Sequence, residues 1–139
     1  MFKRILVPVD GSEHATKAAR LAGDICRAMG SNLLVVTIFD PIPHYLGEPF
    51  IQEVLSKRLE LAQVVLDKAL SQVGKIPGEL QSETIEGPVA EAILILVENR
   101  NIDLVVMGSR GLGRLQGLVI GSQSQKVVQH ASCPVLLVR

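Results

Sequence analysis

Hydrophobic and polar positions follow two different periods along the chain, and each period predicts a different kind of element. Short, mainly apolar runs recur at 2–9, 32–39, 102–107 and 134–138. Such runs are typical of strands that a sheet buries on both faces. The segment 79–86, ELQSETIE, is polar and alternates only weakly, which is typical of an edge strand. The pattern therefore predicts five strands.

The segments between these runs are predicted to be helical, and in the first three the apolar residues recur at steps of three and four. The first predicted helix has its apolar residues within 15–29, and the second spans 51–73. The third starts at Gly87-Pro88 and has its apolar face within 90–97, and the fourth spans 122–130. Ser12 is the predicted N-cap of the first helix, and Gly30 is its predicted stop. Residues 40–49 contain three prolines and are predicted to lack regular structure.

Strands and helices alternate from end to end, which predicts one α/β domain over residues 1–139 with a doubly wound parallel sheet. In such a sheet, ligands bind beyond the carboxyl ends of the strands, where the strand order reverses. Asp10-Gly11-Ser12 follows the first strand, and a glycine-rich segment follows the fourth. If these two strands are neighbours, both connections face one crevice. We therefore predict the strand order 3-2-1-4-5, with Pro134–Val138 on an edge.

Composition and charge narrow the classes of ligand. Apolar residues make up 47% of the chain, but aromatic residues only 3%, with no Trp, which argues against a stacking platform for a flavin or a single-stranded nucleic acid. The net charge is zero, with 14 basic and 14 acidic residues. No acidic residue follows Asp103, whereas four basic residues do, so residues 1–103 hold 10 basic against 14 acidic groups. A positive excess beside a glycine-rich segment favours a small anion over a nucleic acid.

The cysteines and histidines show no metal-ligand spacing. Cys26 and Cys133 are predicted to pack in the core. His14, His44 and His130 are scattered and are predicted to lie at the surface or at helix ends. The opening sequence MFKRILVPVD enters a strand directly, and no apolar run approaches the ~20 residues of a membrane span. We therefore expect a cytoplasmic protein without a membrane partner.

The glycine-rich segment 108–122, GSRGLGRLQGLVIGS, contains five glycines, which are costly to order. It is not a P-loop, because no glycine here precedes Lys-Ser or Lys-Thr. It is not the dinucleotide-binding fingerprint G-x-G-x-x-G either. That motif follows the first strand, whereas Gly111-Leu-Gly113 follows the fourth, and Gln116 occupies the position of the third glycine. A receiver domain would have paired acids after its first strand, where this chain has Asp10 alone.

The spacing that remains, Gly108-x2-Gly111-x9-Gly121-Ser122, suits a phosphate ligand. Gly108 and Gly111 let main-chain amides approach a ribose or phosphate without a Cβ in the way. Gly121 and Ser122 begin a helix, whose free N–H groups and positive dipole end favour anions by about 0.3–1 kcal/mol per charge. The hydroxyls of Ser122 and Ser124 can donate to phosphate oxygens.

At these residues the chain resembles the universal stress protein family, in its ATP-binding branch. The resemblance covers essentially all 139 residues and rests on ILVPVDGS, VVMGSRG, IGSQSQKVV and CPVLLV. The family's nucleotide motif, G-x2-G-x9-G-[ST], is met at every fixed position. The resemblance implies an adenine nucleotide alpha hydrolase-like fold, ATP and Mg²⁺ as ligands, and a role in stress adaptation.

The resemblance also implies which residues meet the nucleoside. Pro8 and Val9 would border it. Ile38, at the end of the second strand, would meet adenine through its backbone. Met107 and Gly108 would lie beside the adenosine.

On the phosphate side, the resemblance implies that Asp10 lies near the ribose and phosphates and holds Mg²⁺ through water. The residues that would cradle the phosphates are Gly111, Gly121, Ser122, Gln123 and Ser124. Gln123 departs from the family pattern, in which many relatives carry a small apolar residue, but its backbone N–H remains available.

The candidate site has anion donors and one carboxylate but no evident nucleophile–base pair, so it favours binding over turnover. We predict a regulatory ATP-binding protein. Slow ATP hydrolysis or autophosphorylation is the alternative, with Ser122 or Ser124 as the nearest hydroxyl. An adenylyltransferase or ATP pyrophosphatase of the related superfamily would need a further substrate pocket, and a nucleotide-free interaction protein would lack the glycine motif. Pro134–Val138, as an exposed apolar edge, is predicted to pair two subunits in a homodimer.

Overall fold

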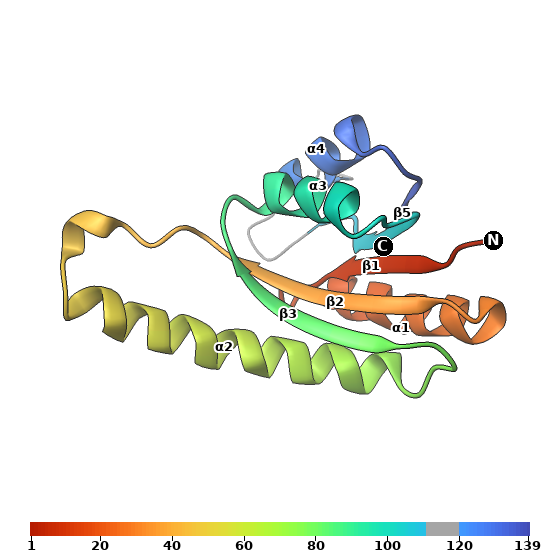
Figure 1. The fold of residues 1–139 in the computed structure, drawn as a ribbon, viewed down its shortest axis with the longest axis horizontal. Helices are drawn as coiled ribbons and strands as arrows, with labels where there is room; N and C mark the ends of the chain where they lie inside the picture. The colour runs from red at the N-terminus through yellow and green to blue at the C-terminus, as the bar shows by residue number, and fades with distance from the viewer. Residues whose placement is uncertain (111–119) are drawn as a thin grey trace.

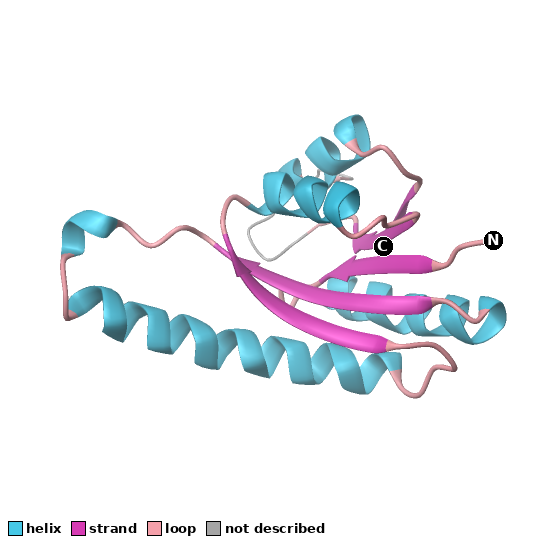
Figure 2. Ribbon diagram, viewed as in Figure 1, coloured by secondary structure: helices cyan, strands magenta, loops and turns pink. Residues whose placement is uncertain are grey.

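The computed structural model describes residues 1–110 and 120–139 and is built on a five-stranded sheet (Figures 1 and 2). The strands are β1 (Arg4–Pro8), β2 (Asn32–Phe39), β3 (Leu80–Glu86), β4 (Leu104–Gly108) and β5 (Val135–Val138). Neighbouring strands are parallel throughout, in the order β3-β2-β1-β4-β5. The predicted doubly wound sheet and its strand order are confirmed.

In the described part of the chain, four α-helices cover the two faces of this sheet. They are α1 (Glu13–Met29), α2 (Phe50–Val73), α3 (Val89–Asn99) and α4 (Ser122–His130). In Figure 1, α1 and α2 lie on one face and α3 and α4 on the other. The buried apolar side chains form two matching clusters, one under each pair of helices. All four predicted helices are therefore confirmed.

The helix α1 packs closely on the sheet because its inward side chains are small. The fully buried ones are Ala18, Ala19, Ala22 and Cys26. The predicted ends of this helix are also confirmed. The Ser12 hydroxyl accepts a hydrogen bond from the Ala15 N–H at 3.2 Å, and Gly30 ends the helix in the left-handed conformation, with φ 71°.

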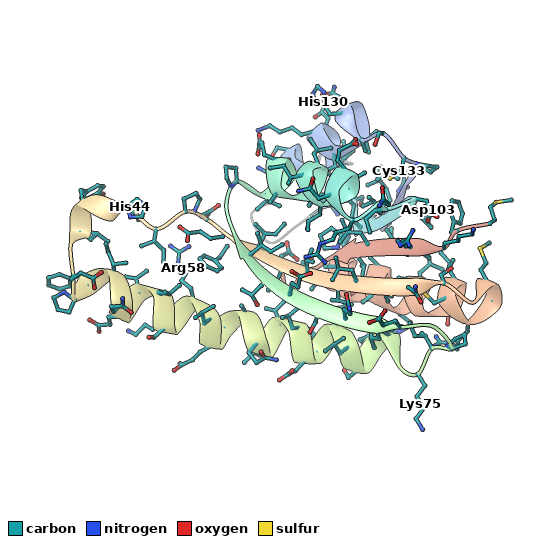
Figure 3. All side chains as sticks on the ribbon, viewed as in Figure 1. His44, Arg58, Lys75, Asp103, His130 and Cys133 are labelled. Atoms are coloured by element: carbon teal, nitrogen blue, oxygen red, sulfur yellow. The ribbon has the colours of Figure 1, made fainter. Side chains whose placement is uncertain are left out.

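Both cysteines belong to the packed interior, as predicted. Cys26 is fully buried in the cluster under α1, and burial raises the pKa of its thiol. Cys133 is half-buried against the other cluster. Burial, and next the charge of the neighbouring Asp103, raise the pKa of the Cys133 thiol; both residues are labelled in Figure 3. Raised pKa values keep both thiols protonated and unreactive at neutral pH.

The segment 40–49 differs from the prediction, because part of it is regular. A short 3₁₀ turn, η1 (His44–Leu46), forms there. The Leu46 N–H donates to the Pro43 carbonyl at 3.4 Å, and the Gly47 N–H donates to the His44 carbonyl at 3.3 Å. Hydrogen bonds between residues three apart form within a single turn of a 3₁₀-helix. Such a turn fits between the prolines of this segment, which prevent a longer helix.

The two sheet edges are β3 and β5. The edge strand β5 is only partly covered, and Leu136 is 37% exposed. Within residues 1–110 and 120–139, no helix has the length and apolar character required to cross a bilayer.

Candidate functional site

A cleft of about 440 Å³ opens at the carboxyl ends of β1, β2 and β4, against the first turns of α3 and α4. All the predicted site residues within the described part of the chain line it. They are Pro8, Val9, Asp10, Ile38, Met107, Gly108, Gly121, Ser122, Gln123 and Ser124. Gly111, the remaining predicted residue, lies outside the described residues. The strand order thus brings together residues that the sequence separates by more than a hundred positions.

Several lining residues did not emerge from the motif. They are Ser12, Ala15, Asp40, Val89, Ile93 and Arg110. Val89 and Ile93 form an apolar wall from α3, and both fall within the third predicted helix, which starts at Gly87-Pro88. Asp40 follows β2 as Asp10 follows β1, so its position after a strand end was an available signal.

The segment that carries Asp40 is held on both sides. Arg58 of α2, labelled in Figure 3, donates from its guanidinium to the Asp40 carbonyl at 3.0 Å. The Ile42 N–H donates to the Glu86 carboxylate at 3.0 Å. These two hydrogen bonds hold the backbone around Asp40 at the cleft.

The turn after β1 fixes the orientation of Asp10. Its Oδ1 accepts a hydrogen bond from the Ser12 N–H at 2.9 Å, which is the pattern of an Asx turn. Gly11 between them has φ 86°, a conformation that glycine adopts at little cost. The turn leads into α1 and leaves the Asp10 carboxylate at the mouth of the cleft.

The end of β4 lies unusually close to α1. A Cβ on Gly108 would stand 2.8 Å from the His14 Cβ and 3.0 Å from the Ala15 nitrogen. Glycine at 108 is therefore required by the packing of β4 against α1. This is a second reason for the glycine, in addition to the ligand approach predicted from the sequence.

Ser109 joins three elements at this end of the sheet. Its N–H donates to the Val138 carbonyl at 2.8 Å, and its carbonyl accepts from the Gly121 N–H at 2.6 Å. Its hydroxyl lies 3.0 Å from His14 Nδ1. Through these contacts the start of α4 has a fixed position relative to β4, β5 and α1.

The first turn of α4 presents main-chain amides to the cleft. The first hydrogen bond within the helix runs from the Gln125 N–H to the Gly121 carbonyl, so the N–H groups of Ser122, Gln123 and Ser124 have no acceptor inside the helix. They add to the positive end of the helix dipole. This end of the cleft favours an anion, and two carboxylates, Asp10 and Asp40, and one guanidinium, Arg110, also line the cleft.

The Ser124 side chain differs from the expectation that its hydroxyl donates to a phosphate. Ser124 is buried, and its hydroxyl donates to the Gly108 carbonyl at 2.8 Å. A hydroxyl has a single proton, so Ser124 offers the cleft its main-chain amide and ties α4 to β4 with its side chain. Ser122 is exposed and lines the cleft.

Comparisons with known proteins agree on one family. The sequence model of the universal stress protein family matches residues 1–139. A Thermus aquaticus protein named universal stress protein in QAH/OAS sulfhydrylase 3′ region is 50% identical over 139 residues, which are all of this chain and all of that protein. The structure of universal stress protein UspA from Lactobacillus plantarum is 28% identical, with a TM-score of 0.82 over 99% of this chain and 98% of that one.

Two further structures of the same fold contain adenine nucleotides. A universal stress protein in complex with cAMP is 21% identical, with a TM-score of 0.73 over 99% of this chain and 97% of that one. The Archaeoglobus fulgidus universal stress protein in complex with dAMP is 18% identical, with a TM-score of 0.74 over 100% of this chain and 98% of that one.

Proposed function

The chain belongs to the universal stress protein family, and we propose that it is a regulatory protein whose single domain, residues 1–139, binds ATP with Mg²⁺ in the cleft between β1 and β4. One observation carries the proposal. The three amides at the start of α4 face the same cleft as the Asp10 carboxylate and the apolar wall of α3. That combination suits a ligand whose anionic end meets the amides, whose bound metal ion meets Asp10, and whose flat ring system packs on the apolar wall.

The nucleoside would occupy the part of the cleft at the carboxyl ends of β1, β2 and β4. Pro8, Val9 and Met107 supply apolar contacts there, and Ile38 contributes the end of β2. The α3 wall closes the opposite side. A cleft of about 440 Å³ lies within the range of about 300–1,000 Å³ that is usual for ligands of this size.

The phosphates would lie against the first turn of α4. The amides of Ser122, Gln123 and Ser124 would donate to them, Gly121 would let them approach closely, and Gly111 is proposed to contribute as the motif implies. Hydrogen bonds from neutral donors to a charged acceptor contribute about 1.5–3 kcal/mol each, so three such bonds from this turn would contribute substantially to the polar binding energy.

Asp10 fits Mg²⁺ better than it fits a metal held by protein ligands alone. The described residues contain no group of three or more His, Cys, Asp or Glu side chains placed to hold a metal ion. Mg²⁺ commonly uses one or two carboxylates, with phosphate oxygens and waters as its other ligands. When bound, the ion would neutralise phosphate charge beside Asp10.

Binding is better supported than catalysis. A Ser–His contact exists between Ser109 and His14, but Ser109 is only 3% exposed and is not among the residues that line the cleft. The Ser124 hydroxyl is engaged with Gly108. If slow hydrolysis or autophosphorylation occurs, Ser122 is the hydroxyl best placed to take part.

The substitution Gly121→Val tests the proposed site. Gly121 has φ −75° and ψ 161°, which valine adopts readily, so the helix should still form while the side chain blocks the phosphates. We expect ATP affinity, measured by calorimetry, to fall at least about tenfold. The matched control is Ala131→Val at the other end of α4, where the backbone is similar, with φ −67° and ψ 140°. Equal ATP affinity in both variants would refute the placement of the phosphates.

We also propose a homodimer in which β5 pairs with β5 of a second subunit. The strand is an apolar edge with Leu136 partly exposed, and an edge of this kind is normally covered or paired. A two-fold axis would make the two strands antiparallel. The cytoplasmic location stays a prediction from the sequence.

A further inference from the structure

Gln123 connects the starts of the two helices that wall the cleft. It is the second residue of α4, and its side-chain Oε1 accepts a hydrogen bond from the Ala90 N–H of α3 at 3.1 Å. The contact joins residues 33 positions apart in the chain. Its main-chain amide belongs to the α4 turn that is proposed to hold phosphate.

The helix α3 depends on this contact because it lacks a side-chain cap of its own. Its N-cap is Pro88, which makes no side-chain capping bond. The first bond within the helix runs from the Ala92 N–H to the Pro88 carbonyl at 3.0 Å, so the Ala90 N–H has no acceptor in α3. Ala90 is also fully buried, and a buried donor without an acceptor is strongly unfavourable.

The same turn of α3 carries the apolar wall of the cleft. Val89 adjoins Ala90, Ile93 follows one turn later, and both line the cleft. The Gln123 side chain therefore holds the first turn of this wall against the start of α4, while the ion pair of Lys126 with Glu91 at 3.9 Å joins the same two helices at the surface. A small apolar residue at 123 would have no acceptor with which to make the contact.

We propose that Gln123 is a positioning residue of the nucleotide site, an inference that rests on the proposed function. Its side chain holds the wall that packs on the nucleoside, while its main-chain amide serves the phosphates. One residue thus fixes the position of the nucleoside wall relative to the phosphate-binding amides.

Two substitutions separate the side-chain role from the phosphate role. Gln123→Leu keeps the size of the side chain and removes the acceptor. We expect the affinities for adenosine and for ATP to fall by a similar factor, about three- to tenfold. Gln123→Glu keeps an acceptor, which the positive end of α3 favours, but adds a charge beside the phosphates. We expect it to restore adenosine affinity relative to Gln123→Leu and to weaken ATP binding, most of all at low ionic strength.

Other patterns overturn the inference. Adenosine affinity that is unchanged in Gln123→Leu would mean that the contact does not position the wall. A loss confined to ATP would mean that the side chain acts on the phosphates. Failure of Gln123→Glu to improve on Gln123→Leu with adenosine would mean that the acceptor is irrelevant. If Gln123→Leu does not fold, Gln123→Asn, which is one methylene too short for the contact, replaces it with the same expectations.

Amide hydrogen exchange distinguishes failure of the inference from failure of the proposed function. The Ala90 amide should exchange faster in Gln123→Leu than in the wild type and should regain protection in Gln123→Glu, without any nucleotide present. Unchanged Ala90 exchange in a protein that binds ATP would overturn only the role of Gln123. A wild-type protein that binds neither adenosine nor ATP would overturn the proposed function, whatever the exchange shows.

Discussion

The substitution Gly108→Ala should disturb both the fold and the proposed site, because Gly108 lies where β4 meets α1. The added Cβ would be 2.8 Å from the His14 Cβ and 3.0 Å from the Ala15 nitrogen, whereas carbon atoms in contact normally stand about 3.5–4.0 Å apart. The opposing atoms belong to the first turn of a helix and cannot rotate away. The strand and the helix would have to separate.

The expected magnitude follows from two opposing effects. Overpacking of this kind lowers the free energy of unfolding by about 1–3 kcal/mol. Replacing glycine also reduces the conformational entropy of the unfolded chain, which raises the free energy of unfolding by about 0.4–1 kcal/mol. The net free energy of unfolding should fall by about 1–2 kcal/mol, which corresponds to a Tm lower by about 3–7 °C in a chain of this length. ATP affinity should fall as well, because the Gly108 carbonyl holds the Ser124 hydroxyl at the start of α4.

Thermal unfolding and calorimetry with ATP measure these two effects, and Gly30→Ala is the control. Gly30 has φ 71°, and a Cβ added there would meet no atom within 4 Å. Alanine at this position therefore costs about 1–2 kcal/mol of backbone strain without touching the cleft. We expect both variants to lose stability but only Gly108→Ala to lose ATP affinity. Wild-type stability and affinity in Gly108→Ala would refute the close approach of β4 to α1.

Three further predictions concern the same region and the β5 edge. Asp10→Asn keeps the Asx turn and removes the charge, so ATP affinity should fall more with Mg²⁺ than with a chelator present; equal losses would show that Asp10 does not act through the ion. Ser124→Ala removes a buried hydrogen bond and should lower the free energy of unfolding by about 1–3 kcal/mol, whereas Ser122→Ala at an exposed position of the same turn should be close to neutral in the same denaturation experiment. Leu136→Lys on β5 should give a light-scattering mass of 15.0 kDa, the mass of one chain, where the wild-type dimer gives twice that value. The control Leu80→Lys, at a similarly exposed position of the other edge strand, should keep the mass of the dimer. A wild-type mass of one chain would contradict the proposed dimer.

Apart from the 3₁₀ turn at His44–Leu46, the sequence by itself determined the kinds of element, their order along the chain and the sheet that they form. These properties depend on periods of apolar residues within one strand or helix, which are local and can be counted. The strand order followed from one more local fact, the small and polar residues after the first and fourth strands. A cleft at that point then follows from the geometry of parallel sheets.

Only the tertiary structure decided how the cleft is held together. The contacts between Gln123 and Ala90, between Ser124 and Gly108, and between Gly108 and His14 each join segments that are distant in sequence. None leaves a periodic signal, because each depends on the distance between two packed elements and on where one side chain points. The sequence could therefore name Ser124 as a phosphate donor, but only the packing of α4 on β4 reveals that its hydroxyl is already used by the fold.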